Sequence, residues 1–328
     1  MFLYNYWYVS ARSKDVGRTP LARRVLGEDI VLYRTEDGGV VALRDRCPHR
    51  LAPLSMGELI GDEIRCRYHG FRFNGDGKCV AIPGETVVPP TMRVDAFPSV
   101  ERHQMVWTWM GNKDAADPTL IPEWPWLERP DFAHFHFDFT IDVPMMAIVD
   151  NLLDLSHVHF LHKLLGADNM IHDSDRMQVW RKGDGVYWSR KLRKGSRVKP
   201  GTYLEVGGAY LLPSICLTNT TLHDEKNDEV LPETMTRILH CLTPQDGDST
   251  RYLPIRSWNV LTRPREIAEL EHRTIFTVQE DKEMLEAQHR VRLRSPKSPE
   301  RLIRSDAASV DARRMFDEAL RQSTPQAG

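Results

Sequence analysis

Two mixed pairs of cysteine and histidine near the N-terminus constrain this 328-residue chain more than any other feature. Cys47 and His49 are separated by one residue, Cys66 and His69 by two, and sixteen residues lie between the pairs. Each pair brings one thiolate and one imidazole to the same loop. A donor set of this kind holds metal, and it requires a fold that presents two loops side by side.

Two cysteines on one iron and two histidines on the other are the ligands of a Rieske [2Fe–2S] cluster. Neutral imidazole leaves less negative charge on its iron than thiolate does, which raises the reduction potential. Such a cluster accepts electrons from a ferredoxin-type donor. Pro48 and Gly70 fit tight loops that bring backbone amides towards the sulfides. The alternatives are buried cysteines beside unrelated histidines, or a structural zinc site, although zinc favours Cys–Cys and His–His pairs.

A second group of metal-binding side chains lies in a segment expected to be helical over about residues 146–162. On an ideal helix, Asp150, Asp154 and His157 share one face. His162 lies about 140° from His157, so both histidines can bind one ion only if a distortion or a helix end separates them. The spacing therefore predicts an irregularity in this helix.

Two neutral imidazoles and one carboxylate bind ferrous iron and leave positions open for dioxygen. Asp281 is a candidate for the carboxylate, because it lies on the apolar stripe of a predicted helix with Val278 and Leu285. A carboxylate there is costly unless it is paired or bound to metal. Periodicity alone supports an ion pair with an arginine equally well. The neighbouring Glu280 is expected to face solvent.

The first 110 or so residues contain short runs of strand-forming residues separated by turns. Residues 30–33 and 40–43 flank Asp-Gly-Gly, and residues 71–73 and 78–80 flank Asn-Gly-Asp-Gly. Both arrangements are typical of β-hairpins. The N-terminal region is therefore predicted to be a small antiparallel domain.

Prolines punctuate residues 112–130, where neither a helix nor a central strand can continue, so a domain boundary is expected there. Residues 135–143 alternate as one strand does, and strand-like runs fill residues 175–260. Residues 265–322 are helical in pattern, with a break expected at Pro296 and Pro299. The two predicted domains are residues 1–115 and 116–328.

Composition excludes several classes of function. The net charge of −2 and the scattered basic residues argue against nucleic-acid binding. No apolar run approaches the roughly 20 residues of a membrane span, so no membrane partner is expected. The five cysteines are odd in number and irregularly spaced, which is a poor disulfide framework and favours the reducing cytoplasm.

Several motifs recur in the same order in one family. They are Trp7-Tyr8-Val9, the Cys47/His49/Cys66/His69 set, the run from Asp150 to His157 with His162, and Glu280-Asp281-Lys282. With them the chain resembles, nearly end to end, the Rieske non-haem iron oxygenases, and among these the oxygenase components of vanillate and dicamba O-demethylases. The resemblance implies an α+β chain, with an all-β Rieske domain followed by a helix-grip catalytic domain. In the latter, a large antiparallel sheet wraps against the C-terminal helix.

The resemblance also assigns roles to residues. It implies that His157, His162 and Asp281 bind a mononuclear Fe(II). It implies that Asp154 bridges a cluster histidine and an iron-binding histidine across the subunit interface of a homotrimer. Asn151 is expected to lie beside the iron without being a strong ligand.

The substrate pocket is less constrained. His240, in His240-Cys241-Leu242-Thr243-Pro244, resembles the histidine that touches substrate in the dicamba enzyme, but a histidine that ends a strand before a turn fits equally well. His272 stands where that relative has a pocket tryptophan. The middle of the catalytic domain also looks shorter than in vanillate demethylases. Both departures leave the identity of the substrate open.

The expected function is O2-dependent monooxygenation of an aromatic substrate. O-demethylation is expected first: hydroxylation of a methoxy carbon gives a hemiacetal that collapses to a phenol and formaldehyde. No Gly-x-Gly-x-x-Gly motif follows a strand, so electrons from NAD(P)H are expected through a separate flavin and ferredoxin-type reductase. Alternatives with the same iron site are ring hydroxylation or cis-dihydroxylation, methyl hydroxylation and N-demethylation. A Rieske electron carrier and a metal-free ligand-binding helix-grip protein are the alternatives from other classes.

Overall fold

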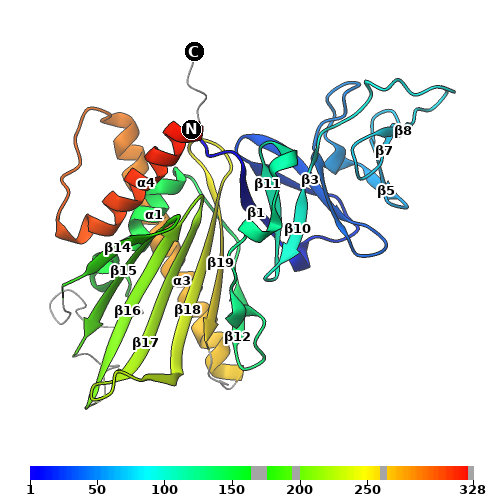
Figure 1. Ribbon diagram of the computed structural model, residues 1–328. Helices are drawn as coiled ribbons and strands as arrows, with labels where there is room; N and C mark the ends of the chain where they lie inside the picture. Colours follow the sequence, from blue (N-terminus) through cyan, green and yellow to red (C-terminus); the bar gives the residue numbers. More distant parts are fainter. Residues whose placement is uncertain (164–175, 194–199, 259–263, 324–328) are drawn as a thin grey trace. The chain divides into compact units, whose positions relative to one another are not determined.

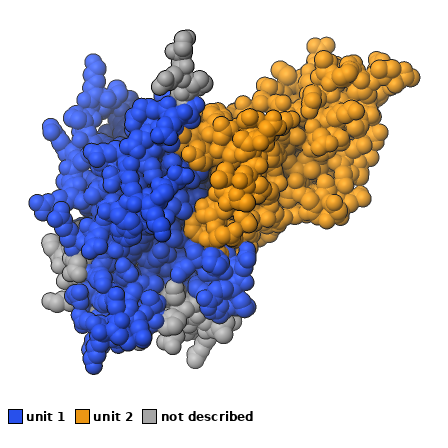
Figure 2. All heavy atoms as spheres, viewed as in Figure 1, with its two compact units in different colours: residues 1, 125–242, 247–328 blue, residues 2–124, 243–246 orange. Residues whose placement is uncertain are grey.

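The structure is a computed structural model that describes residues 1–163, 176–193, 200–258 and 264–323. The chain divides into two compact units (Figure 2). The N-terminal unit comprises residues 2–124 and 243–246, and the C-terminal unit comprises residue 1 with 125–242 and 247–328. The chain thus passes between the two units at 124/125, within the proline-rich stretch. The division into domains at 115/116 stays a prediction.

The N-terminal unit is built from three small antiparallel sheets (Figure 1). One has the order β1 (Tyr6–Arg12), β11 (Met105–Met110), β10 (Ser99–Arg102). The second has the order β2 (Leu21–Val25), β3 (Glu28–Arg34), β4 (Val40–Arg44), β9 (Ala96–Phe97). The third has the order β5 (Glu58–Ile60), β6 (Glu63–Arg65), β7 (Arg72–Phe73), β8 (Cys79–Ala81). Short 3₁₀ turns are η1 (Ser13–Asp15), η2 (Leu54–Met56), η3 (Lys113–Ala115) and η4 (Pro118–Leu120).

Both predicted hairpins are confirmed, since β3 pairs with β4 and β7 pairs with β8. Strand β3 separates two hydrophobic cores, because its alternate side chains point to opposite faces. Val31 and Tyr33 pack in the core that contains Cys47 and Cys66, whereas Leu32 packs in the other core. The candidate cluster loops are therefore anchored in a dedicated core.

The N-terminal unit includes four residues from far along the chain, 243–246. The Thr243 hydroxyl donates to the carbonyl of Val9 at 2.5 Å. The backbone amides of Leu26 and Gly27 donate to the carbonyls of residues 244 and 245, at 2.8 and 2.7 Å. This unit is thus completed by a segment that follows most of the C-terminal unit in sequence.

The C-terminal unit contains one large antiparallel sheet with helices on one face (Figure 1). Its order is β12 (Ala133–His136), β19 (Thr250–Trp258), β18 (Val230–Pro244), β17 (Ile215–Asp224), β16 (Thr202–Leu211), β15 (Gly185–Leu192), β14 (Gln178–Lys182), and β13 (Phe139–Ile141) also pairs with β19. The prediction of strands over 175–260 is confirmed for the described part of that range, while residues 175, 194–199 and 259–260 lie outside it. The single strand expected over 135–143 is wrong. The segment forms two shorter strands, β12 and β13, with a break opposite Pro254 of β19. Proline has no amide hydrogen to donate to the ladder, and its carbonyl accepts a hydrogen bond from the amide of Phe137.

Three helices of this unit pack over the sheet through one hydrophobic core: α1 (Met145–Leu153), α3 (Pro264–Arg294) and α4 (Ala307–Ser323). The unit also contains the short helix α2 (Val158–Leu161), which has no buried residue, and the 3₁₀ turns η5 (Pro125–Leu127), η6 (Leu155–His157) and η7 (Arg304–Asp306). The gap between α3 and α4 contains Pro296 and Pro299, as predicted. An antiparallel sheet against a long C-terminal helix confirms the α+β helix-grip architecture. The described helices include none with both the length and the apolar character that a membrane crossing requires.

Candidate metal centres

The two loops with the predicted cluster ligands have the same backbone closure. In each loop, the residue four positions after the cysteine donates its amide to the cysteine carbonyl: Leu51 to Cys47 at 2.9 Å, and Gly70 to Cys66 at 3.0 Å. Both donors have left-handed backbone conformations, with φ of 58° at Leu51 and 75° at Gly70. The next residue in each loop returns its carbonyl to the cysteine amide. The two mixed pairs are therefore presented by matching turns.

The four predicted cluster ligands meet at the ends of these loops. Cys47 and Cys66 are both buried, with 2% of their surface exposed. The rings of His49 and His69 lie 4.5 Å apart between centroids, and His49 stacks on Phe71 at 4.8 Å. His69 is exposed. The pairing of loops expected from the sequence is thus present in the structure.

The residues of this centre fit a [2Fe–2S] cluster chemically. Burial raises the pKa of Cys47 to about 11, so a thiolate there requires a nearby cation. The Nδ1 atom of His49 is buried and has no hydrogen-bond partner among the described residues. Such an atom costs about 1–3 kcal/mol, which binding to metal relieves. Two irons would supply both the positive charge and the missing partner.

Asp154 shapes the segment that carries the second centre. Its backbone is extended (φ −115°) and its carboxylate accepts from the amide of Ser156 at 2.9 Å, so α1 ends at Leu153 and a new turn begins. The single helix predicted over 146–162 is therefore wrong, and so is the shared face of Asp150 and His157. The predicted helix end between His157 and His162 is confirmed, because α2 ends at Leu161 and His162 has an extended backbone.

Three donor atoms converge in the C-terminal unit. The Nε2 atoms of His157 and His162 each lie 3.4 Å from the same Oδ1 atom of Asp281, on α3. The ligand atoms of these residues all lie within 4.8 Å of one another. Ligands at about 2.0–2.2 Å from a common ion are roughly 3.0–3.6 Å apart, so the observed spacing fits one metal ion. Two imidazoles and one carboxylate are the donor set typical of non-haem ferrous iron.

The tautomers of both histidines favour metal binding. Nδ1 of His157 donates to the main-chain carbonyl of Asp154 at 2.7 Å, and Nδ1 of His162 donates to the carboxylate of Glu280 at 3.2 Å. Each Nε2 therefore keeps its lone pair, directed towards Asp281. Burial opposes a positive charge on His157, but Asp281 and, less strongly, Asp154 together raise the pKa of His157. The site thus attracts cations.

The expectation that Glu280 faces solvent is wrong. Only 11% of its side chain is exposed, and it orients His162. The only sequence signal for this role is its position beside Asp281. Asn151, as expected, lies beside the three donors: its Nδ2 donates to Asp281 Oδ1 at 3.0 Å and lies 3.4 Å from His157 Nε2.

The carboxylates of Asp154 and Asp150 have other partners within the chain. Asp154 accepts from the Ser156 hydroxyl at 2.9 Å and from the Ser305 hydroxyl at 3.2 Å, and it reaches His157 only through its carbonyl. Its predicted bridge between subunits stays a prediction. Asp150 forms an ion pair with Arg313 of α4, and burial raises its pKa. Asp150 thus holds α4 against α1 rather than contributing to the metal centre.

The two predicted substrate residues differ in their surroundings. His240 is buried, with Nε2 3.0 Å from the Thr218 hydroxyl and Nδ1 2.6 Å from the Tyr252 hydroxyl. Burial lowers the pKa of His240 to about 3, so its ring is neutral. His272 is exposed on α3. Substrate contact by either residue stays a prediction.

Comparison with known proteins identifies the type of both domains. Residues 6–98 match the Rieske [2Fe-2S] domain, and residues 141–322 match the vanillate O-demethylase oxygenase C-terminal domain. The vanillate O-demethylase oxygenase subunit of Pseudomonas sp. (strain ATCC 19151) is 31% identical over 336 residues, which cover 90% of this chain and 95% of that protein. A putative toluene-4-sulfonate monooxygenase iron-sulfur subunit of Comamonas testosteroni is 47% identical over 178 residues, 52% of this chain. The match spans about half the length of that relative, 49%.

Solved structures show the same fold. Dicamba monooxygenase bound to 3,6-dichlorosalicylic acid superposes with a TM-score of 0.91 at 27% identity, over 99% of both chains. The structure of dicamba monooxygenase with non-heme iron and dicamba gives 0.83 at 27% identity, over 98% of both chains. The resemblance seen in the sequence is confirmed, and both donor sets fit the cofactors of that group, a Rieske [2Fe–2S] cluster and a mononuclear iron. The chain belongs to the Rieske non-haem iron oxygenase components with a catalytic domain of the vanillate O-demethylase type.

Proposed function

We propose that this chain is the terminal oxygenase of a multicomponent system, and that it catalyses O2-dependent monooxygenation of an aromatic substrate, with O-demethylation and formaldehyde release as the leading reaction. One observation carries the proposal: His157, His162 and Asp281 converge in a chain that also has a Rieske domain. A Rieske electron carrier requires only the cluster ligands. A ligand-binding helix-grip protein requires neither the cluster ligands nor the three iron ligands.

Two sets of ligand residues would hold two different cofactors. When bound, the cluster supplies single electrons and the ferrous iron activates dioxygen beside the substrate. Cys47, His49, Cys66 and His69 would hold the cluster. His157, His162 and Asp281 would hold the iron, with two neutral imidazoles and one negative charge. Glu280 and the carbonyl of Asp154 keep the Nδ1 protons in place, which fixes the direction of both rings.

The active unit is proposed to be a homotrimer in which Asp154 links the cluster of one subunit to the iron site of its neighbour. The position of Asp154 supports this, since its carbonyl orients His157 while its carboxylate has only serine partners among the described side chains. Asn151 would help to orient Asp281. This arrangement is the one that the resemblance to the vanillate and dicamba demethylases implies.

The substrate is proposed to be a polar aromatic compound. Named relatives act on vanillate, dicamba and toluene-4-sulfonate. His240 is proposed as a substrate contact from the resemblance of its segment to that of the dicamba enzyme, and its ring is buried and neutral. The exposed side chain of His272 gives that residue no such support. Electrons would come from NAD(P)H through a separate flavin and ferredoxin-type reductase. The five cysteines, none in a disulfide, are consistent with a cytoplasmic location.

Iron content and product analysis test the proposal together. The oxygenase should contain about three irons per chain, whereas an electron carrier would contain about two. Asp281→Asn should remove one iron and leave the cluster spectrum unchanged. Formaldehyde release from vanillate or dicamba would support demethylation. Hydroxylation of toluene-4-sulfonate without formaldehyde would favour methyl hydroxylation, and an iron content of two in the wild type would reject the oxygenase.

A further inference from the structure

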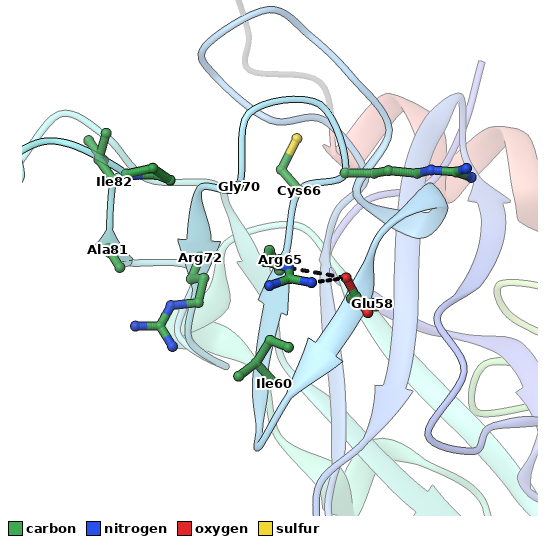
Figure 3. A pocket seen from close by; sticks show the side chains of 10 residues that line it. Glu58, Ile60, Arg65, Cys66, Gly70, Arg72, Ala81 and Ile82 are labelled. Atoms are coloured by element: carbon green, nitrogen blue, oxygen red, sulfur yellow. Dashed lines mark hydrogen bonds and ion pairs between the residues drawn. The ribbon is translucent and has the colours of Figure 1, made fainter.

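A pocket of about 540 Å³ opens on the N-terminal unit beside Cys66 (Figure 3). Its walls come from the β5–β8 sheet and from the second cluster loop. Its lining includes Arg65, Arg67 and Arg72, with Glu58 as the one carboxylate. We call this lining the arginine pocket. It has a surplus of two positive charges, although the whole chain has a net charge of −2.

The charges of the arginine pocket are only partly neutralised within the chain. Arg65 is bonded to Glu58, as Figure 3 shows, and Arg72 lies 3.4 Å from Glu63. Arg67 is exposed, and no carboxylate among the described residues pairs with it. The guanidinium without a carboxylate partner, that of Arg67, therefore belongs to the residue that directly follows Cys66, a predicted cluster ligand.

Two arginines of the pocket lie opposite each other on neighbouring strands, and Glu58 and Glu63 offset part of their repulsion. Arg65 and Arg72 are direct cross-strand partners in β6 and β7. Like charges opposite one another destabilise an antiparallel pair. A concentration of like charge is typical of a functional surface, and here Arg67 is the arginine for which a partner would supply the opposite charge. The arginines also sit on or beside a small sheet, which presents them as a fixed pattern.

We propose that the arginine pocket is the docking surface for the acidic face of a ferredoxin-type [2Fe–2S] donor. The proposal rests on the proposed function, which requires electrons from another protein. Cys66 itself lines the pocket, so a donor seated there lies next to a cluster ligand. Transfer moves one electron from the reduced donor to the oxidised chain, and no bond or proton changes place. Carboxylates of the donor would pair with Arg67 and Arg72 and steer the encounter.

Charge reversal tests this surface. The variant R67E/R72E is compared with K14E/K113E, which reverses two exposed lysines of the same unit with no ion pair among the described residues. The loaded protein is mixed with a reduced, acidic plant-type ferredoxin, and the second-order rate of cluster reduction is followed by absorbance at several salt concentrations. Complex formation is measured separately by surface plasmon resonance.

R67E/R72E should lower the rate and the affinity at least about tenfold at low salt, and added salt should slow the wild type towards the variant. K14E/K113E should stay within about twofold of the wild type. Equal rates and affinities in all three proteins would overturn the docking surface. A changed oligomeric state in R67E/R72E alone would also overturn it, because the pocket would then face another copy of the chain.

Reduction by dithionite separates this proposal from the proposed function. A cluster that forms and is reduced by dithionite in every variant leaves the Rieske function standing, whatever the ferredoxin does. A wild-type chain without a reducible cluster would instead reject the proposed function itself.

Discussion

Glu280 accepts a hydrogen bond from Nδ1 of His162 at 3.2 Å, and both side chains are largely buried, with 11% and 2% exposed. Glu280 directly precedes the proposed iron ligand Asp281 on α3. The same turn of helix therefore provides one carboxylate for the metal and another for the histidine that shares it. A carboxylate behind a ligating imidazole fixes the tautomer and increases the basicity of the ring.

Removal of the Glu280 carboxylate should weaken iron binding. Glu280→Ala is expected to lower the affinity for Fe(II) about 10- to 100-fold, and Glu280→Gln, which can still accept from Nδ1, should lower it less. Affinity is measured by competition with a chelator, with the cluster absorbance as an internal standard. Glu283→Gln, an exposed change on the same helix, is the control. Unchanged affinity in Glu280→Ala would show that His162 does not depend on this contact.

Asp154→Asn should separate catalysis from assembly. Asparagine caps a helix start about as well as aspartate, so the turn at Ser156 and both metal centres should form normally. Turnover should be abolished if the carboxylate carries electrons between subunits. Iron content and product formation are measured on the same sample, with Asp317→Asn on the exposed side of α4 as the control. Retained turnover in Asp154→Asn would eliminate the bridge.

The Asp150–Arg313 pair predicts a pH-dependent stability. Burial raises the folded pKa of Asp150 above its ordinary 3.8, so the stabilising contribution of this group is lost as pH rises through the folded value. Arg313 limits this loss, and Arg313→Gln should raise the pKa of Asp150 further. The difference in unfolding free energy between wild type and Arg313→Gln should therefore grow from pH 4.5 to 7.5. The difference should reach about 1–2 kcal/mol. This lies between the values for exposed and buried ion pairs, because 44% of the Arg313 side chain is exposed and solvent weakens the interaction.

A second pair of variants controls for the other contacts of Arg313. In an Asp150→Asn background, the effect of Arg313→Gln on unfolding by urea should be small and nearly constant with pH. A pH-dependent difference that persists in this background would assign the effect to another group.

Gly70 is expected to be required for the second cluster loop. Its φ of 75° disfavours a side chain, and an added Cβ would lie 3.0 Å from Pro83. Gly70→Ala should cost about 1–2 kcal/mol and lower the cluster content. Gly17 has no atom within 4 Å of an added Cβ and no left-handed backbone, so Gly17→Ala should stay within about 0.5 kcal/mol. Equal cluster content in both variants would show that the loop tolerates the strain.

The sequence predicts the cluster loops well because each pair of ligands is local. One or two spacer residues bring Cys47 and His49, or Cys66 and His69, to the same turn, whatever the rest of the chain does. The hairpins follow from short turn motifs for the same reason. Helix periodicity fails at Asp154, because a capping side chain ends α1 where the apolar pattern continues. Asp154 two residues before Ser156 is a capping signal that the periodicity concealed.

The carboxylates on α3 could not be sorted from sequence. Glu280 and Asp281 differ by about 100° around the helix, and the rotation of α3 decides which of them faces the histidines. That rotation depends on packing against a sheet and on α1, both distant in the chain. Similarly, the strand expected over 135–143 breaks because of Pro254 on its partner strand, which periodicity within 135–143 cannot reveal.

The hydrogen bonds of Leu26 and Gly27 to residues 244 and 245 have a consequence for biosynthesis. The ribosome makes these two amides early, but their acceptors only after β14–β18 have been translated. The N-terminal unit therefore cannot reach its final form while it is the only part of the chain outside the ribosome. In a protein truncated at residue 124, these two amides would bond to water. A separate peptide with residues 243–246 would supply the two carbonyl acceptors again.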